Sequence, residues 1–266
     1  MLKKVFVLTQ FGKHHKWTKQ YLDNIKRLGQ YGWYWKIFTP NKYKNVPSNC
    51  EIIPMTIEEF NTLIEKKLGY NPQNFITDKG VPSKPVSDFY VATGVIFEDY
   101  IKGYDFWGIT NWDVVYGRLD QFLPDDMLSE LDVFTDDVGQ VNGVFSLFKN
   151  IKKVNNLFRE IPDIEKMLTE HRLFGIDEIY LIEPLRKASK SEALTYIHPQ
   201  FYPLHSYDRL IQHVPVPQLE IQTDGSLWEK FKDMDIPPNS EYNFPKGYIA
   251  KEIMYFHFSY TKKWPL

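Results

Sequence analysis

The sequence predicts an α/β protein whose central sheet is mixed, mostly parallel and flanked by helices. Two observations support this fold class. The chain opens with a strand-like run, a helix-like run and a second strand-like run, which is typical of a β-α-β unit in a parallel sheet. Further along, the polar residues 110–113 directly follow the apolar run Tyr104–Ile109, and open α/β sheets place ligands at such strand ends.

The expected elements follow in chain order. Short runs rich in β-branched and aromatic side chains predict strands at 4–9, 33–38, 52–53, 104–109, 131–135 and 143–148. Apolar residues at helical spacing predict helices at 17–28, 56–67 and 88–100, with further helices from 154 and before 175. Thr56 and Glu59 are spaced as a capping box. From residue 195 onward, short apolar stretches separated by prolines predict an irregular C-terminal flank.

Composition narrows the class of protein. The 266 residues are 43% hydrophobic and 16% aromatic, which is enough for a large core or for a cleft that stacks planar rings. The single cysteine, Cys50, cannot form an intramolecular disulfide, which favours a reducing compartment such as the cytoplasm. No apolar run is long enough for a transmembrane segment, and the N-terminal residues become polar too early for a signal peptide. We therefore expect a soluble, cytoplasmic protein.

Charge is distributed unevenly along the chain. The first 50 residues hold ten basic residues and one acidic residue, a net charge of +9, so the remaining 22 basic and 33 acidic residues give −11. A cationic edge on an acidic body suits a phosphate-bearing ligand or a polyanion. The alternative is a set of dispersed surface lysines with no common ligand.

The strand-end cluster holds the clearest chemical signal. Asn111 and Asp113 offer oxygen ligands two residues apart, of the kind that Mg²⁺ or Mn²⁺ shares with water and a diphosphate. The alternative is an Asn/Asp turn at the end of a strand. The sequence lacks a P-loop, a dinucleotide-binding glycine turn, a nucleophile elbow, a zinc-protease helix and paired CxxC motifs, so most common nucleotide-binding and hydrolase motifs are absent.

Several stretches, in order, carry a resemblance to a known family. They are VFVLTQFGK, WKIFTP, PMTIEEFN, SDFYVATGVIFEDYIKGYDFWGITNWDVVYGRLDQFL, GVFSLFKN, GIDE and YFHFSYTKKW. Together they resemble an uncharacterised bacterial and viral family of proposed glycosyltransferases that is similar to GT-A enzymes, whose hallmark is an Asp-x-Asp element after a central strand. The resemblance implies one GT-A-like domain over 1–266, with a nucleotide-sugar-binding half at 1–120 and an acceptor-binding half with the C-terminal segment at 121–266.

The resemblance also implies roles for particular residues on the donor side. Asn111 and Asp113 fall on the two ends of the Asp-x-Asp element, with Trp112 between them, and the first acid is replaced by an uncharged amide. His257 matches a terminal histidine that completes the metal shell, although a packed histidine of an aromatic strand is the alternative. The remaining residues expected at the nucleotide sugar are Thr9, Gln10, Phe11, Gly12, Thr39, Trp112, Lys262 and Lys263.

On the acceptor side, the resemblance points to three acidic residues. Asp88 matches an acidic position near the sugar, where relatives often have Lys in the place of Tyr90. Asp177 and Glu178 match a paired acid motif on a late loop, and one of them is expected to take the proton of the acceptor hydroxyl. Two adjacent carboxylates on a loop are not expected to reach the same hydroxyl, so the second of these two acids is expected to have a structural role. His171 is a further candidate, and aromatic side chains are expected to wall the cleft: Trp107, Trp112 and Tyr116.

These residues predict a metal-dependent glycosyltransferase that uses Mn²⁺ or Mg²⁺ and a nucleotide sugar, with a UDP-sugar favoured. The resemblance favours a surface glycan as acceptor. The cationic N-terminal segment also permits a hydroxymethylated base in viral DNA as acceptor. A different class of protein, a nucleotide-sugar-binding module without catalysis, is consistent with Asn111 in place of an acid. The donor sugar, the stereochemistry and the oligomeric state stay open.

Overall fold

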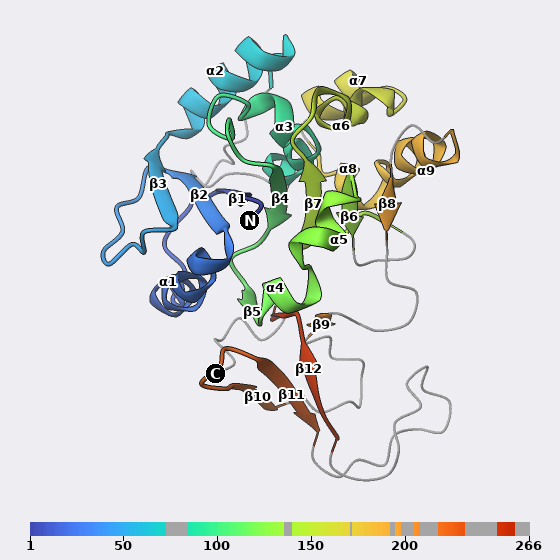
Figure 1. Cartoon of the computed structure of the whole chain (residues 1–266). Coiled ribbons are helices and arrows are strands. Elements are labelled where there is room, and N and C mark those ends of the chain that lie inside the picture. The colour runs from blue at the N-terminus through green and yellow to red at the C-terminus, as the bar shows by residue number, and fades with distance from the viewer. Residues whose placement is uncertain are drawn as a thin grey trace.

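A seven-stranded sheet runs through the centre of the molecule (Figure 1). The computed structural model describes residues 1–72, 84–135, 140–170, 172–191, 195–197, 205–207, 218–231 and 249–258. Within them the strand order is β3-β2-β1-β4-β7-β6-β8. These strands are β1 (Lys4–Thr9), β2 (Trp33–Thr39), β3 (Cys50–Pro54), β4 (Phe106–Thr110), β6 (Val133–Thr135), β7 (Phe145–Lys149) and β8 (Tyr196–Ile197).

The sheet is mixed and mostly parallel, as predicted. The four strands β3, β2, β1 and β4 are parallel to one another. β7 is antiparallel to both of its neighbours, β4 and β6, and β8 is parallel to β6. The parallel strands therefore bring their carboxyl ends to one edge of the sheet, where the turns after β1, β2 and β4 meet.

Helices cover both faces of the sheet. The alternation along β1 separates two cores, with Val5 and Val7 in one and Phe6 and Leu8 in the other. The first core is covered by α2 (Ile57–Leu68), α3 (Thr93–Ile96), α6 (Lys152–Asn155), α7 (Ile164–Thr169), α8 (Ile176–Ile179) and α9 (Ile182–Lys190). The second is covered by α1 (Thr18–Lys26), α4 (Leu119–Phe122) and α5 (Asp125–Ser129). Short 3₁₀ segments add Arg27–Tyr31, Lys84–Ala92 and Leu157–Glu160.

Local signals set the ends of α2, and the capping box is confirmed. The Thr56 hydroxyl accepts from the backbone N–H of Glu59 at 3.2 Å, and the Glu59 carboxylate accepts from the backbone N–H of Thr56 at 2.7 Å. Gly69 ends the helix with a φ of 75°. A residue with a side chain adopts that conformation only with strain, so glycine is the residue that fits this stop.

The predicted helix at 88–100 differs in the structure. A 3₁₀ segment, Lys84–Ala92, leads into the short helix α3, and turns follow it. Tertiary contacts explain the difference. Asp88 is only 1% exposed and binds a distant segment, and a Cβ on Gly94 would lie 2.5 Å from Oδ1 of Asn155. The segment packs so tightly against its neighbours that it does not follow its local helical periodicity.

The described residues of the C-terminal flank form short strands rather than wholly irregular chain. β10 (Gln218–Ile221), β11 (Leu227–Phe231) and β12 (Ile249–Ile253) form an antiparallel sheet, drawn in orange to red in Figure 1. β13 (Tyr255–His257) lies between β5 (Val114–Tyr116) and β9 (His205–Tyr207), antiparallel to β5 and parallel to β9. The C-terminal flank thus contributes a strand, β13, that pairs with β5, the strand that follows β4.

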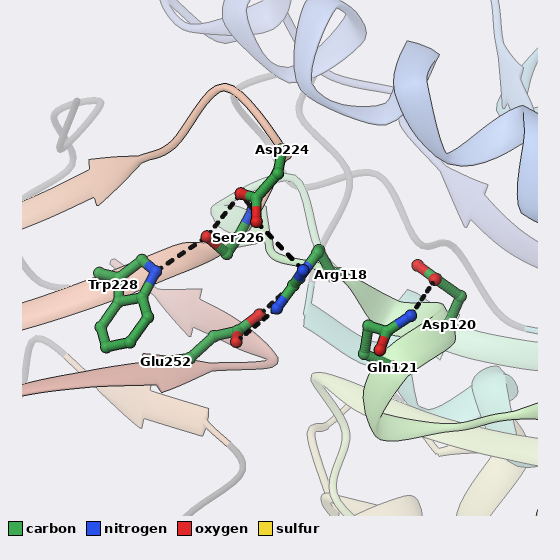
Figure 2. Close-up of polar contacts among 7 residues, drawn as sticks. All are labelled: Arg118, Asp120, Gln121, Asp224, Ser226, Trp228 and Glu252. Atoms are coloured by element: carbon green, nitrogen blue, oxygen red, sulfur yellow. Dashed lines mark hydrogen bonds and ion pairs between the residues drawn. The ribbon is translucent and has the colours of Figure 1, made fainter.

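Arg118 connects β12 to the segment after β5 (Figure 2). Its guanidinium donates two hydrogen bonds to the carboxylate of Glu252, both 2.8 Å long, and a third to Asp224 at 3.1 Å. We call these three residues the Arg118 bridge. Glu252 lies five residues before His257, and Arg118 lies five residues after Asp113. The bridge therefore fixes β12 close to the point where β13 meets β5.

No helix in the described part of the chain has the length and apolar character needed to cross a lipid bilayer.

Candidate active site

Asp113 and His257 meet at the carboxyl end of β4. Nε2 of His257 lies 3.2 Å from Oδ1 of Asp113, and the two side chains are only 11% and 13% exposed. The antiparallel pairing of β13 with β5 places them, and the backbone N–H of Phe258 donates to the carbonyl of Asp113 at 2.9 Å. Two residues that are far apart in the sequence therefore form one polar group, as the resemblance implies.

The chemistry of this pair fits a divalent cation. Adjacent ligands of an octahedral ion with bonds of 2.0–2.1 Å lie about 3 Å apart, close to the separation of the Asp113 oxygen and the His257 nitrogen. In the described residues no group of three His, Cys, Asp or Glu side chains is arranged to hold a metal. A cation bound by Asp113 and His257 would leave positions for further ligands such as water and a phosphate.

The residues beside Asp113 differ in their surroundings. Asn111 is half-buried. Trp112 is buried, with its ring near Tyr21 and stacked on Tyr43 at 5.8 Å between centroids, and its carbonyl accepts from Nε1 of Trp17 at 2.7 Å. These contacts fix the backbone of the turn that carries Asp113.

The expectation that Trp107, Trp112 and Tyr116 wall an open cleft is wrong, because all three side chains are buried. Trp107 is 1% exposed and stacks on Phe148 at 4.3 Å between ring centroids. Tyr116 is fully buried, and its hydroxyl hydrogen-bonds the hydroxyl of Thr110. Trp107 lies on β4, which has a covered core on each face, and Tyr116 lies within the second core together with its neighbour Val115, so both side chains are enclosed.

The turn after β1 contains the residues expected at the nucleotide. The amide of Gln10 is engaged within the protein, since Nε2 donates to the carbonyl of Lys13 at 2.9 Å and Oε1 accepts from the hydroxyl of Tyr43. Phe11 packs on Phe60 at 5.2 Å between ring centroids. A Cβ on Gly12 would meet nothing within 4 Å, so this turn borders open space. The turn therefore leaves room for a ligand mainly at Gly12.

The end of β2 lies beside this turn. The Thr39 hydroxyl accepts from the backbone N–H of Asn41 at 3.1 Å, and Thr39 is fully buried. Asn41 in turn donates from Nδ2 to the carbonyl of Gly12 at 2.7 Å. Thr39 therefore supports the turn after β1 through Asn41.

Tyr90 is a further candidate residue. The sequence indicated only that relatives often have Lys at this position. Burial raises the pKa of its phenol, the hydroxyl contact with Thr9 opposes that rise, and the charges of Asp177 and Asp113 add to it. Tyr90 is thus within electrostatic reach of Asp113 and of Asp177. Its raised pKa keeps the hydroxyl protonated near neutral pH, where it can donate a hydrogen bond.

Asp88 holds the chain just before α8. Its carboxylate accepts three backbone hydrogen bonds, from Phe174 at 2.9 Å, Gly175 at 2.8 Å and Ile176 at 3.1 Å. Burial raises the pKa of Asp88, while these three N–H donors oppose the rise. Both oxygens are engaged by backbone, so in this structure Asp88 positions the helix that begins at Ile176.

Asp177 and Glu178 lie in the first turn of α8, not on a loop, and they approach one point. A Cβ on Gly143 would lie 2.6 Å from Oδ2 of Asp177 and 3.1 Å from Oε1 of Glu178. The expectation that the two carboxylates cannot face one place is therefore wrong, because the longer side chain of Glu178 reaches the same backbone position. Burial, with the charge of Glu178 next, raises the pKa of Asp177 to about 7.

Three further candidates, His171, Lys262 and Lys263, lie outside the described residues. The described candidates with charged or titratable side chains fall into two groups. Asp113 and His257 lie together at the carboxyl end of β4, and Asp88, Asp177 and Glu178 lie together at the start of α8.

The chain belongs to a family described as "Family of unknown function (DUF6625)", whose match covers residues 6–263. A solved structure that resembles it is the crystal structure of the glycosyltransferase GlyE in Streptococcus pneumoniae TIGR4. That likeness has 15% sequence identity and a TM-score of 0.36, and it covers 75% of this chain and 46% of that chain. The chain thus spans less than half the length of that structure. The search of curated proteins found no match.

Proposed function

We propose that the protein transfers a sugar from a nucleoside diphosphate donor, most readily a UDP-sugar, to a hydroxyl group of a surface glycan. The observation that carries the proposal is the meeting of Asp113 with His257 at the carboxyl end of β4, beside the open turn at Gly12. An oxygen and a nitrogen ligand about 3 Å apart suit an ion that is shared with a diphosphate. The family resemblance of the flanking stretches supports the same assignment.

On the donor side, Asp113 and His257 would hold Mn²⁺ or Mg²⁺, and such an ion neutralises the charge that develops on a departing diphosphate. The chain's own residues supply the rest. The turn at Gly12 gives the nucleotide access, and Tyr90 offers a neutral hydroxyl as hydrogen-bond donor. Buried Trp112 keeps the backbone that carries Asp113 in place.

On the acceptor side, Asp177 and Glu178 share the space in front of Gly143. A carboxylate that hydrogen-bonds the attacking hydroxyl removes its proton as the new sugar bond forms. The raised pKa of Asp177, about 7, is close to the pH at which a general base works best, so Asp177 is the candidate for the base. Asp88 contributes by holding the start of α8.

The proposal is tested by incubating the protein with single nucleotide sugars and Mn²⁺ and measuring the release of nucleoside diphosphate. We expect slow release from at least one UDP-sugar, and a loss of at least a hundredfold in Asp113→Asn, which keeps the size of the side chain and removes its charge. Asp23→Asn is the matched control, because Asp23 is exposed and pairs only with Lys19 on α1.

Two results would contradict the proposal. One is full activity in Asp113→Asn, which would show that Asp113 and His257 do not take part in the reaction. The other is thermal stabilisation by a nucleotide sugar with no release of nucleoside diphosphate from any donor, which would identify a binding protein without catalysis.

A further inference from the structure

Four exposed lysines gather on the two loops that follow β1 and β2. They are Lys13, Lys16, Lys42 and Lys44. Two hydrogen bonds join the loops, from Nδ2 of Asn41 to the carbonyl of Gly12 at 2.7 Å and from the hydroxyl of Tyr43 to Oε1 of Gln10. The lysines therefore belong to one surface rather than to two independent loops.

The charge of this surface is not neutralised by the described part of the protein. None of the four lysines forms an ion pair with a residue that the structure describes. Asp23 is the sole acidic residue among the first 50, and it pairs with Lys19 on α1. A concentration of unopposed cations at one edge attracts anionic ligands.

Aromatic rings lie among the lysines. His14 is exposed and meets the ring of Tyr43 edge-on, at 4.6 Å between centroids and 72° between planes. Tyr43 is half-buried and stacks on Trp112. None of the large hydrophobic side chains that are exposed in the described residues lies on these two loops. Polar rings without exposed aliphatic side chains suit a sugar face better than insertion into a lipid bilayer.

This surface adjoins the candidate active site. Trp112, on which Tyr43 stacks, stands between Asn111 and Asp113 in the sequence, and its carbonyl accepts from Nε1 of Trp17 at 2.7 Å. The surface therefore borders the turn that carries Asp113. We name the four lysines together with His14 and Tyr43 the lysine–aromatic surface.

The charge of the whole chain distinguishes between possible anionic polymers. Outside the first 50 residues the net charge is −11, and the site itself contains Asp113, Asp177 and Glu178. A long nucleic acid has a phosphate at every nucleotide and would meet these negative groups along its length. A short glycan with carboxylate groups, confined to the two loops, places its charges on the lysines and the faces of its sugar rings on His14 and Tyr43.

We propose that the lysine–aromatic surface binds an anionic glycan. The proposed binding does not depend on the proposed transfer reaction. It needs only the two joined loops, their four lysines and the rings of His14 and Tyr43.

Binding of hexagalacturonate, an oligosaccharide with one carboxylate per sugar, tests the proposal when it is measured by calorimetry without any donor. Neutral maltohexaose and a single-stranded decathymidylate serve as comparison ligands. The test variant replaces all four lysines of the surface by glutamine. The control variant makes the same change at four exposed lysines outside the two loops, which are Lys66, Lys102, Lys152 and Lys187.

We expect hexagalacturonate to bind, and its affinity should fall as the salt concentration rises from 20 to 200 mM, because salt screens the attraction between its carboxylates and the lysines. The test variant should bind at least tenfold more weakly, and the control variant within about twofold of the unmodified protein. Maltohexaose should bind at least tenfold more weakly than hexagalacturonate.

Three results would overturn the proposal. They are no binding of hexagalacturonate at 20 mM salt, equal losses in the two variants, and tighter binding of decathymidylate than of hexagalacturonate, which would assign the surface to nucleic acid. Because no donor is present, none of these results depends on catalysis, and failure of the donor experiment leaves this measurement intact.

Discussion

At the scale of single residues, Asp177 combines burial with a charged neighbour. It is 6% exposed, and burial together with the charge of Glu178 raises its pKa from the ordinary 3.8 to about 7. Between about pH 4 and pH 7 the folded protein therefore keeps a proton that the unfolded chain has lost. The free energy of unfolding should fall as pH rises through that window, by up to about 4 kcal/mol.

The variant Asp177→Asn tests this pH dependence. The amide cannot ionise, so the melting temperature should fall less between pH 4.5 and pH 7.5 than it does in the unmodified protein, and stability at pH 7.5 should rise. Thermal unfolding followed by circular dichroism measures both quantities. Asp23→Asn, at an exposed carboxyl, should leave the pH profile unchanged. An unchanged profile in Asp177→Asn would mean that Asp177 is ionised throughout the window.

Single residues also show what the sequence could reveal about the site. Asp113 was identifiable because two oxygen-bearing residues follow an apolar strand, and His257 because of its resemblance to a terminal histidine. Tyr90 was not assigned a role, since nothing in its local sequence shows that the charges of both Asp113 and Asp177 reach it. The buried positions of Trp107 and Tyr116 were missed because a composition rich in aromatics does not distinguish a core from a cleft.

At the scale of elements, α8 depends on a residue that lies far from it in the sequence. Asp88 accepts three backbone hydrogen bonds at the start of the helix, and no side chain of the helix itself caps it. Asp88→Asn keeps the shape but replaces one acceptor oxygen by an N–H₂ group, which cannot accept. We expect a loss of about 1–3 kcal/mol in the free energy of unfolding, because buried N–H donors lose their partner.

Urea denaturation measures this loss, and Asp99→Asn is the control, since Asp99 is fully exposed and pairs with Lys67 at the surface. Water screens exposed pairs of that kind, so they contribute little to stability. If Asp88→Asn is no less stable than Asp99→Asn, the three hydrogen bonds do not hold α8. A drop in transferase activity together with the loss of stability would agree with a positioning role.

Elements differed in how well the sequence predicted them. The β-α-β opening and the capping box at Thr56 were predicted correctly because their signals are local, namely periodicity, caps and turns. The segment 88–100 was predicted as one helix and is not, because Asp88 and Gly94 make contacts with residues that local spacing does not reveal. The first turn of α8 was read as a loop, since four residues are too few to show helical periodicity.

At the scale of the whole molecule, the Arg118 bridge joins the C-terminal strands to the segment that carries Asp113. Arg118 and Glu252 are 30% and 21% exposed, so water screens their contact less than that of a surface pair. Arg118→Gln removes the paired hydrogen bonds to Glu252 and the contact with Asp224. We expect the amide of Phe258, which donates to Asp113, to exchange its hydrogen about tenfold faster, with the central sheet unaffected.

Hydrogen exchange followed by mass spectrometry resolves these regions. Arg186→Gln is the matched control, because Arg186 pairs with Glu183 within α9. Equal exchange at the end of β13 in Arg118→Gln and in the control would show that strand pairing alone holds His257 in place. Faster exchange throughout the sheet would instead assign Arg118 to the general stability of the protein.

The pairing of β5 with β13 has a consequence for the order of events during translation. β1, β2, β3, β4 and β5 leave the ribosome long before β13, so a nascent chain can build the parallel part of its sheet while Asp113 still has no histidine beside it. The contact between Asp113 and His257 is then completed by one of the last strands to be synthesised. A partly made chain therefore contains Asp113 without the histidine contact that the folded protein has.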